Sequence, residues 1–299
     1  ELLEKYANVQ HQRIGFSGIV LVTKNGKELY RVSIGKASNE LGVPINDASV
    51  FKIASITKQF TAMLVATAIG EGKLHLSDSL ADFFPTLKNS EWGKINLHQL
   101  LTHTSGIPHN EGIKNYWTLK SLLPTSKEKA LEEIFSMNLL FEPGAGFKYS
   151  SPGYFILSCI IESVYKQPLE LILEEKILNR LELSHTGVFK TGKIVPFMTS
   201  GYHLIGDSMI ISPFRDFSLM KGGGDMYSTA DDLAKWNSSF STDSTWAKSI
   251  QKLLFSKHTI RRPFYGYGWY IRDSKRTAYY HGGGNFGSTA LSAWYPEER

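Results

Sequence analysis

Hydrophobic and polar residues follow different patterns at the ends and in the middle of the chain. Two N-terminal runs, at 16–23 and 28–34, are rich in valine, isoleucine and leucine, and Asn25-Gly26 between them is typical of a hairpin turn. Near the C-terminus, three short aromatic and β-branched runs are separated by glycine or charged turns. They lie at 266–272, 276–281 and 288–295. The pattern predicts strands at both ends of the chain.

Longer apolar segments in the middle of the chain indicate helices. The run from Ile56 to Ile69 stops at Gly70 and Gly72, and its length favours a largely buried helix over a strand. Further helices are expected at 131–137, 154–165 and 169–181, and around Trp236.

Strands at both ends with helices between them predict an α+β fold, in one domain over residues 1–299. We expect an antiparallel sheet formed from both chain ends, at about 10–50 and 264–299, and flanked by helices. A large helical region at about 55–260 is inserted between them. Residues 296–299 are similar to a turn that leads into another strand, so we expect the natural chain to continue there.

Composition and charge exclude several classes of protein. The 33 lysines and arginines outnumber 28 acidic residues by five, but they are scattered and form no stripe for a nucleic acid. No run approaches the ~20 apolar residues of a membrane span. The single cysteine, Cys159, excludes an intramolecular disulfide. The nine histidines include no His-x-x-x-His pair beside an acid, so we expect no metal and no cofactor.

The candidate nucleophile is Ser55, at the start of the long apolar segment. Lys58 follows three residues later, so in a helix the two side chains share a face. A serine hydroxyl needs a neighbouring base, and a lysine withdrawn from water has a lowered pKa that suits this task. The chain has seven Ser-x-x-Lys sequences, and any of them could be a solvated serine near a surface lysine. Only Ser55 opens a buried helix.

The wider string from Phe51 to Lys58 resembles the serine β-lactamase and penicillin-binding-protein superfamily, especially its class C β-lactamase-like branch of esterases, peptidases and lactamases. The resemblance implies that Ser55 attacks a carbonyl and that Lys58 handles its proton. Tyr149 matches the tyrosine of the family's Tyr-x-Asn motif, whereas Ser151 replaces the asparagine. We expect a nearby ammonium to shift the Tyr149 phenol toward phenolate, so that it relays a proton. The alternative is a loop tyrosine whose hydroxyl faces water.

The third family motif, Lys-Thr-Gly, corresponds to His281-Gly282-Gly283 here, after a strand predicted at 277–280. The resemblance implies that His281, Gly283 and Gly284 border the substrate and that the Gly284 and Ser55 N–H groups form an oxyanion hole. A flexible hairpin loop is the alternative. Because histidine is mostly neutral at pH 7, it would hold a substrate carboxylate less firmly than lysine.

Two other sequence segments match the family, and we expect both to be structural and not catalytic. His103 lies between two threonines before a glycine turn, where we expect a hydrogen-bonded brace. Residues 222–225, Gly-Gly-Gly-Asp, lack the lysine of a phosphate loop, so we expect a closely packed turn near the site.

These features together predict a metal-free serine hydrolase that forms an acyl-enzyme with an ester or amide. A β-lactamase or penicillin-binding D-Ala-D-Ala peptidase is the second hypothesis. A non-catalytic binding or scaffold protein on the same fold is the third. The expected partner is a small-molecule or peptide substrate, and the oligomeric state is open. Family habit suggests a periplasmic or exported protein, and a cytoplasmic location stays possible.

Overall fold

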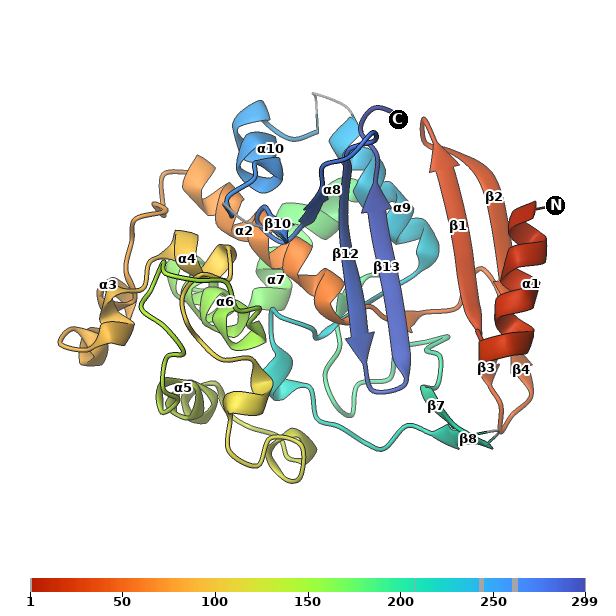
Figure 1. The fold of residues 1–299 in the computed structure, drawn as a ribbon, viewed down its shortest axis with the longest axis horizontal. Coiled ribbons are helices and arrows are strands. Elements are labelled where there is room, and N and C mark those ends of the chain that lie inside the picture. Colours follow the sequence, from red (N-terminus) through yellow and green to blue (C-terminus); the bar gives the residue numbers. More distant parts are fainter. Residues whose placement is uncertain (1, 207, 242–244, 260–262, 299) are drawn as a thin grey trace.

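Strands from the two ends of the chain lie next to each other, and helices from the middle lie behind and beside them (Figure 1). The computed structural model describes residues 2–206, 208–241, 245–259 and 263–298, so Arg299 of the expected C-terminal turn lies outside it. Within these ranges, no helix has the length and apolar character to cross a membrane. The predicted α+β class with antiparallel strands is confirmed.

The N-terminal hairpin forms as predicted. Strands β1 (Gly18–Lys24) and β2 (Lys27–Ile34) are antiparallel, and Asn25 and Gly26 both have positive φ, as a tight hairpin turn requires. Helix α1 (Leu2–Ile14) packs against β2 at the edge of the molecule (Figure 1).

The C-terminal strands form a four-stranded antiparallel sheet in the order β10 (Phe264–Tyr265), β11 (Tyr270–Arg272), β12 (Ala278–Asn285) and β13 (Ser288–Trp294). Strand β12 is longer than predicted, since residues 281–284 continue it and pair with residues 289–292 of β13. The expectation that these glycines follow the end of the strand is therefore wrong. They are held in the ladder because the hairpin turns only at 285–288.

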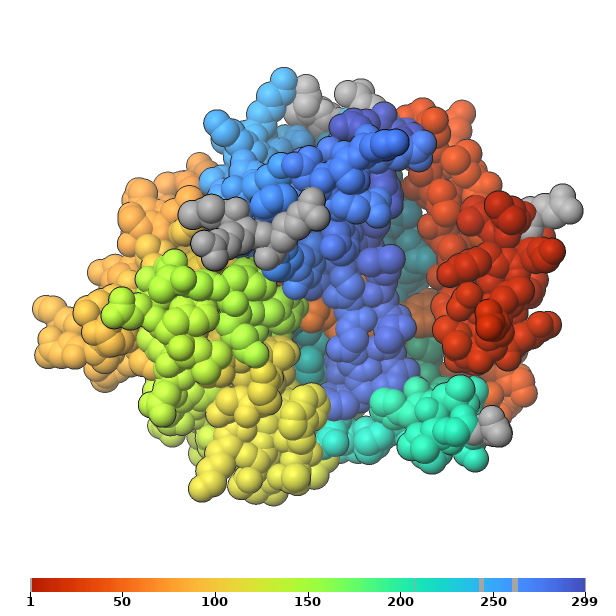
Figure 2. All heavy atoms as spheres, viewed as in Figure 1, coloured from red at the N-terminus to blue at the C-terminus, as the bar shows by residue number. Residues whose placement is uncertain are grey.

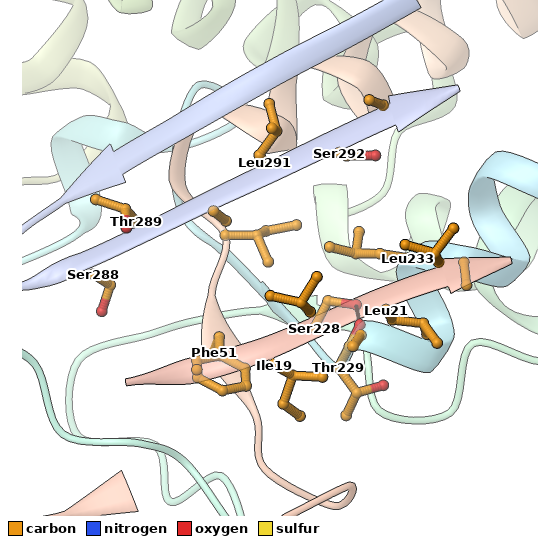
Figure 3. Close-up of a pocket in the computed structure, with 18 of the residues that line it drawn as sticks. Ile19, Leu21, Phe51, Ser228, Thr229, Leu233, Ser288, Thr289, Leu291 and Ser292 are labelled. Carbon is orange, nitrogen blue, oxygen red and sulfur yellow. Dashed lines mark hydrogen bonds between the residues drawn. The ribbon is translucent and has the colours of Figure 1, made fainter. Parts of the chain in front are cut away.

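Strands β1 and β13 face each other across a groove of about 1300 Å³. Ile19 and Leu21 line it from β1 and Leu291 lines it from β13, as Figure 3 shows. In Figure 2 the surface is hollowed between the red hairpin and the blue strands. Among the described residues the two sheets share no ladder, so the single sheet expected from both chain ends is not formed.

The helical region is built around two buried helices. Helix α2 (Thr57–Gly70) is preceded by a 3-10 turn, η1 (Ala54–Ile56), and packs against α6 (Ser151–Tyr165) and α10 (Lys248–Phe255). The other helices are α3 (Leu80–Phe83), α4 (Leu97–Leu101), α5 (Lys127–Phe135), α7 (Leu169–Leu173), α8 (Asn179–Leu181) and α9 (Ala230–Ser238). The helix expected at 169–181 contains a π turn, Glu174–Leu178, between α7 and α8.

Short strands hold the start of α2 in place. Strands β5 (Phe51–Lys52) and β6 (Gly187–Val188) both pair with β9 (Met226–Ser228). Two further pairs, β3 (Lys36–Ser38) with β4 (Val43–Pro44) and β7 (Tyr202–Ile205) with β8 (Ser208–Ile211), lie at the periphery. Because β5 leads directly into η1, its pairing fixes where Ser55 lies.

Candidate active site

Ser55 occupies a tight turn at the entrance to α2. Ala54 before it has φ of +47°, a left-handed conformation that costs a non-glycine residue of order 1–3 kcal/mol. The turn is held by the Thr57 hydroxyl, which donates to the Ala54 carbonyl at 2.6 Å. Ser55 is partly exposed, whereas every other residue from Ile53 to Phe60 is buried. The strained turn therefore presents the serine hydroxyl at the surface of a packed helix.

Lys58 is fully buried, and its ammonium group is completely bonded. Nζ donates to the Gly223 carbonyl at 2.5 Å, to Ser151 Oγ at 3.0 Å and to Ser55 Oγ at 3.3 Å. The spacing of Ser55 and Lys58 thus brings their side chains together, and Ser151 joins them from α6.

Burial lowers the pKa of Lys58 to about 7, and the nearby Asp225 carboxylate acts in the opposite direction. A lysine in water has a pKa near 10.4 and is almost entirely protonated at pH 7. Lys58 is therefore poised to exist as a free amine near neutral pH, which is the form that can accept a proton from Ser55.

Tyr149 lies above Lys58, with its ring centroid 4.7 Å from Nζ. Burial raises the pKa of its phenol well above the ordinary value. The nearby Ser55 hydroxyl acts in the opposite direction, although it forms no hydrogen bond with the Tyr149 hydroxyl. The expectation of a phenolate is therefore wrong. Lys58 Nζ lies over the ring and the phenol oxygen forms no hydrogen bond, so desolvation decides the pKa. Tyr149 is placed as a neutral proton donor.

Two histidines from the segment that follows α4 support the start of α6. His103 Nδ1 accepts the Ser150 N–H at 3.1 Å, and His109 Nδ1 accepts the Ser151 N–H at 3.0 Å. Burial lowers the pKa of His103 well below its usual value and that of His109 to about 4, and the Lys58 charge adds to both shifts. The expectation that His103 is a hydrogen-bonded brace is confirmed.

Strand β12 passes directly beside the Ser55 turn. A Cβ atom on Gly283 would lie 2.2 Å from the Ile53 carbonyl oxygen, so this close approach requires glycine. A Cβ atom on Gly284 would meet nothing within 4 Å, so this residue borders open space. The geometry suits the predicted oxyanion role of the Gly284 N–H, which stays a prediction.

His281 is buried, and both of its ring nitrogens have partners. Nδ1–H donates to the Gly282 carbonyl at 2.6 Å, and Nε2 accepts from the Tyr265 hydroxyl at 3.1 Å. Burial, aided by the Lys58 charge, lowers the pKa of His281 to about 3. The imidazole is therefore neutral and has no free N–H for a substrate, and its predicted contact with substrate stays untested.

Sequence reasoning missed the contacts that Gly223, His109 and Asp225 make around the site. The Gly-Gly-Gly-Asp string marks a turn, but no local signal shows that its carbonyl accepts from Lys58, 165 residues away. In the described residues, no group of three or more histidine, cysteine or acidic side chains is arranged to hold a metal.

Comparison with known proteins places this geometry in a family. Residues 3–294 match the family described as Beta-lactamase. The chain is 26% identical to the putative penicillin-binding protein PbpX of Bacillus subtilis (strain 168) over 261 residues, which cover 87% of this chain and 63% of that protein. It thus spans less than two thirds of that relative's length.

Two solved structures share the fold. A penicillin binding protein from Bacillus halodurans superposes with a TM-score of 0.83 at 24% identity, covering 98% of this chain and 92% of the other. EstCE1, described as a hydrolase with promiscuous acyltransferase activity, has a TM-score of 0.84 at 19% identity, covering 99% and 90%.

Proposed function

The chain belongs to the β-lactamase family, and we propose that it is a serine hydrolase that forms an acyl-enzyme on Ser55 with an ester or amide substrate. One observation carries the proposal. Lys58 Nζ lies 3.3 Å from Ser55 Oγ, is buried, and has a pKa of about 7, so a base of suitable strength adjoins the hydroxyl.

In the first step, Ser55 Oγ attacks the substrate carbonyl carbon and gives its proton to the Lys58 amine. The negative charge that develops on the carbonyl oxygen is stabilised by the N–H groups of Ser55 and Gly284, and each such donor is worth about 10²–10³ in rate. The proton then passes through the Tyr149 hydroxyl to the leaving group as its bond to the carbonyl carbon breaks. Water then attacks the acyl carbon of the Ser55 ester, with Lys58 again as the base, and Ser55 Oγ is released and regains its proton.

The polar groups around Ser55 favour esters and simple amides over substrates that carry a carboxylate. Ser151 offers one hydroxyl where the family asparagine offers an amide, and its Oγ already accepts from Lys58. His281 is neutral, and both its nitrogens are bonded. The strand beside the nucleophile therefore lacks the fixed positive charge that its lysine-bearing relatives supply.

Hydrolysis of β-lactams or D-alanyl peptides is the second candidate. The observation that favours it is the similarity to PbpX, a putative penicillin-binding protein, over most of this chain.

The test compares hydrolysis of a p-nitrophenyl ester with that of a chromogenic cephalosporin, with Ser55→Ala as the control. We expect ester hydrolysis that Ser55→Ala abolishes, and a fluorophosphonate adduct that mass spectrometry locates on Ser55. Faster cephalosporin turnover would favour the second candidate. Absence of labelling in the folded protein would point to a non-catalytic protein on this fold.

A further inference from the structure

A carboxyl group is buried near the Lys58 side chain. Asp225 is 3% exposed and lies beside α2, among Phe60, Leu64 and Val188. Burying a carboxylate in such surroundings is unfavourable unless hydrogen bonds and a charge partner compensate.

The Asp225 carboxylate closes the turn that supplies the acceptor for Lys58. Oδ1 of Asp225 accepts the Gly222 N–H at 3.0 Å, across the turn. The other side of the turn is held by Thr61, whose hydroxyl donates to the Gly222 carbonyl at 2.7 Å. The next carbonyl, that of Gly223, accepts from Lys58 Nζ. Thr61 lies one helical turn after Lys58, so α2 holds the turn through two of its side chains.

Little freedom remains in this arrangement. Gly222 has φ of +65°, and a Cβ atom there would lie 2.6 Å from Ser158 Cβ on α6. The turn is therefore wedged between α2 and α6, and the Gly222 N–H has the Asp225 carboxylate as its acceptor.

We propose that Asp225 is a positioning residue for the reaction. Its carboxylate fixes the turn at 222–225 so that the Gly223 carbonyl holds Lys58 Nζ against Ser55 Oγ. A second role concerns the proton of Lys58. The inference rests on the proposed function of Ser55 and Lys58.

The second role follows from the charges that face Lys58. Asp225 is the carboxylate acting on Lys58, and the other titratable groups around it are neutral near pH 7. These neutral groups are His103, His109, Tyr149, Tyr154 and His281. Burial raises the pKa of Asp225 to about 7, so it titrates in the same range as Lys58. Removing the carboxylate charge destabilises the ammonium and should lower the pKa of Lys58 further.

A purely structural role predicts different behaviour. If Asp225 only closed the turn, an asparagine with the same shape and an acceptor oxygen would preserve both the turn and the titration of Lys58. Asp225→Asn therefore separates the two roles, whereas Asp225→Ala removes both.

The experiment measures ester hydrolysis against pH for the native protein, Asp225→Asn and Asp225→Ala. The matched control is Asp232→Asn in α9, a buried carboxylate that accepts from the His185 N–H at 2.9 Å and the Thr186 hydroxyl at 2.8 Å, outside the Ser55 site. A titration of the Lys58 Nζ signal by NMR accompanies each assay, because it reports the lysine even if the chosen ester is a poor substrate.

We expect Asp225→Asn to move the acidic limb of kcat/KM to lower pH by about one unit, with the Lys58 NMR titration moving equally. Asp225→Ala should in addition lower kcat by about tenfold or more with little change in KM, because the base is misplaced. The control should leave the limb in place. A native kcat in Asp225→Ala would overturn the positioning role, and an unchanged limb with an unchanged Lys58 titration in Asp225→Asn would overturn the effect of the Asp225 charge. A shifted titration without hydrolysis in any variant would support it while the proposed function fails.

Discussion

Two regions border the β12–β13 hairpin, and they differ in what they bury. Beside β12, the Ser55 site holds a buried lysine with a pKa of about 7 and a fully bonded ammonium. Beside β13, the groove of about 1300 Å³ is lined by apolar and hydroxyl side chains such as Leu233 and Thr229 (Figure 3). None of the described residues that line it is a buried lysine, histidine or acid.

The two regions therefore differ in the ionisable side chains that they bury. The groove lies where two sheet edges face each other, and among the described residues its lining holds no buried lysine, histidine or acid that could activate a nucleophile. The reactive group lies where the protein withdraws a few ionisable side chains from water, since burial gives them the pKa values that catalysis needs.

Replacing the nucleophile should have the largest effect. Ser55→Ala removes the atom that attacks the carbonyl, so we expect kcat/KM for a p-nitrophenyl ester to fall by about 10⁴ or more. Ser55 is partly exposed and its hydroxyl bonds only Lys58 among the described residues, so the melting temperature should stay close to native. Residual activity within tenfold of native would mean that another residue is the nucleophile.

Replacing the base should cost less activity and should also change how stability depends on pH. Lys58→Met keeps the volume but cannot accept a proton, so we expect kcat/KM to fall by about 10²–10⁴. Because burial depresses the pKa of Lys58 in the folded protein, the unfolded chain binds an extra proton above pH 7. Lys58 therefore makes stability rise with pH from about 7 to about 10 and fall again on acidification.

Urea unfolding of native protein and Lys58→Met at pH 7 and pH 9 measures this difference. The native protein should gain more stability between the two pH values than the variant. Equal gains would mean that burial does not lower the pKa of Lys58.

Two neighbouring glycines on β12 should respond differently to the same substitution. Gly283→Ala places a methyl group against the Ile53 carbonyl, so we expect the free energy of unfolding to fall by about 1–3 kcal/mol. Because β12 then moves away from Ser55, kcat/KM should also fall by about 10–100-fold. Gly284→Ala meets open space and should melt within about one degree of native. Thermal unfolding of both variants decides the matter, and equal melting temperatures would contradict the close packing.

Local patterns predict the parts of the molecule that local chemistry determines. The Asn25-Gly26 turn defines the first hairpin, and the spacing of Ser55 and Lys58 places their side chains together. The glycines at 282–284 indicate a loop when taken alone, yet pairing with β13 keeps them in a strand, because register with a partner overrides weak strand propensity.

Long-range contacts explain what the pattern could not predict. The acceptor for Lys58 comes from Gly223, and the acceptor for the Ser151 N–H comes from His109, in segments far apart along the chain. The protonation of Tyr149 depends on how deeply its hydroxyl is buried, which no spacing reveals.

The smallest effect is expected from a substitution in the groove wall, which tests whether the groove is separate from the Ser55 site. Leu291 lines the groove from β13, is 70% exposed, and pairs along the ladder with Gly282. Leu291→Ser changes the polarity of the groove wall while keeping the strand, so kcat/KM should stay within about twofold of native and the melting temperature within about two degrees. The same ester assay measures it. A loss beyond tenfold with an intact fold would mean that substrate reaches the groove, and the two regions would then have to be treated as one site.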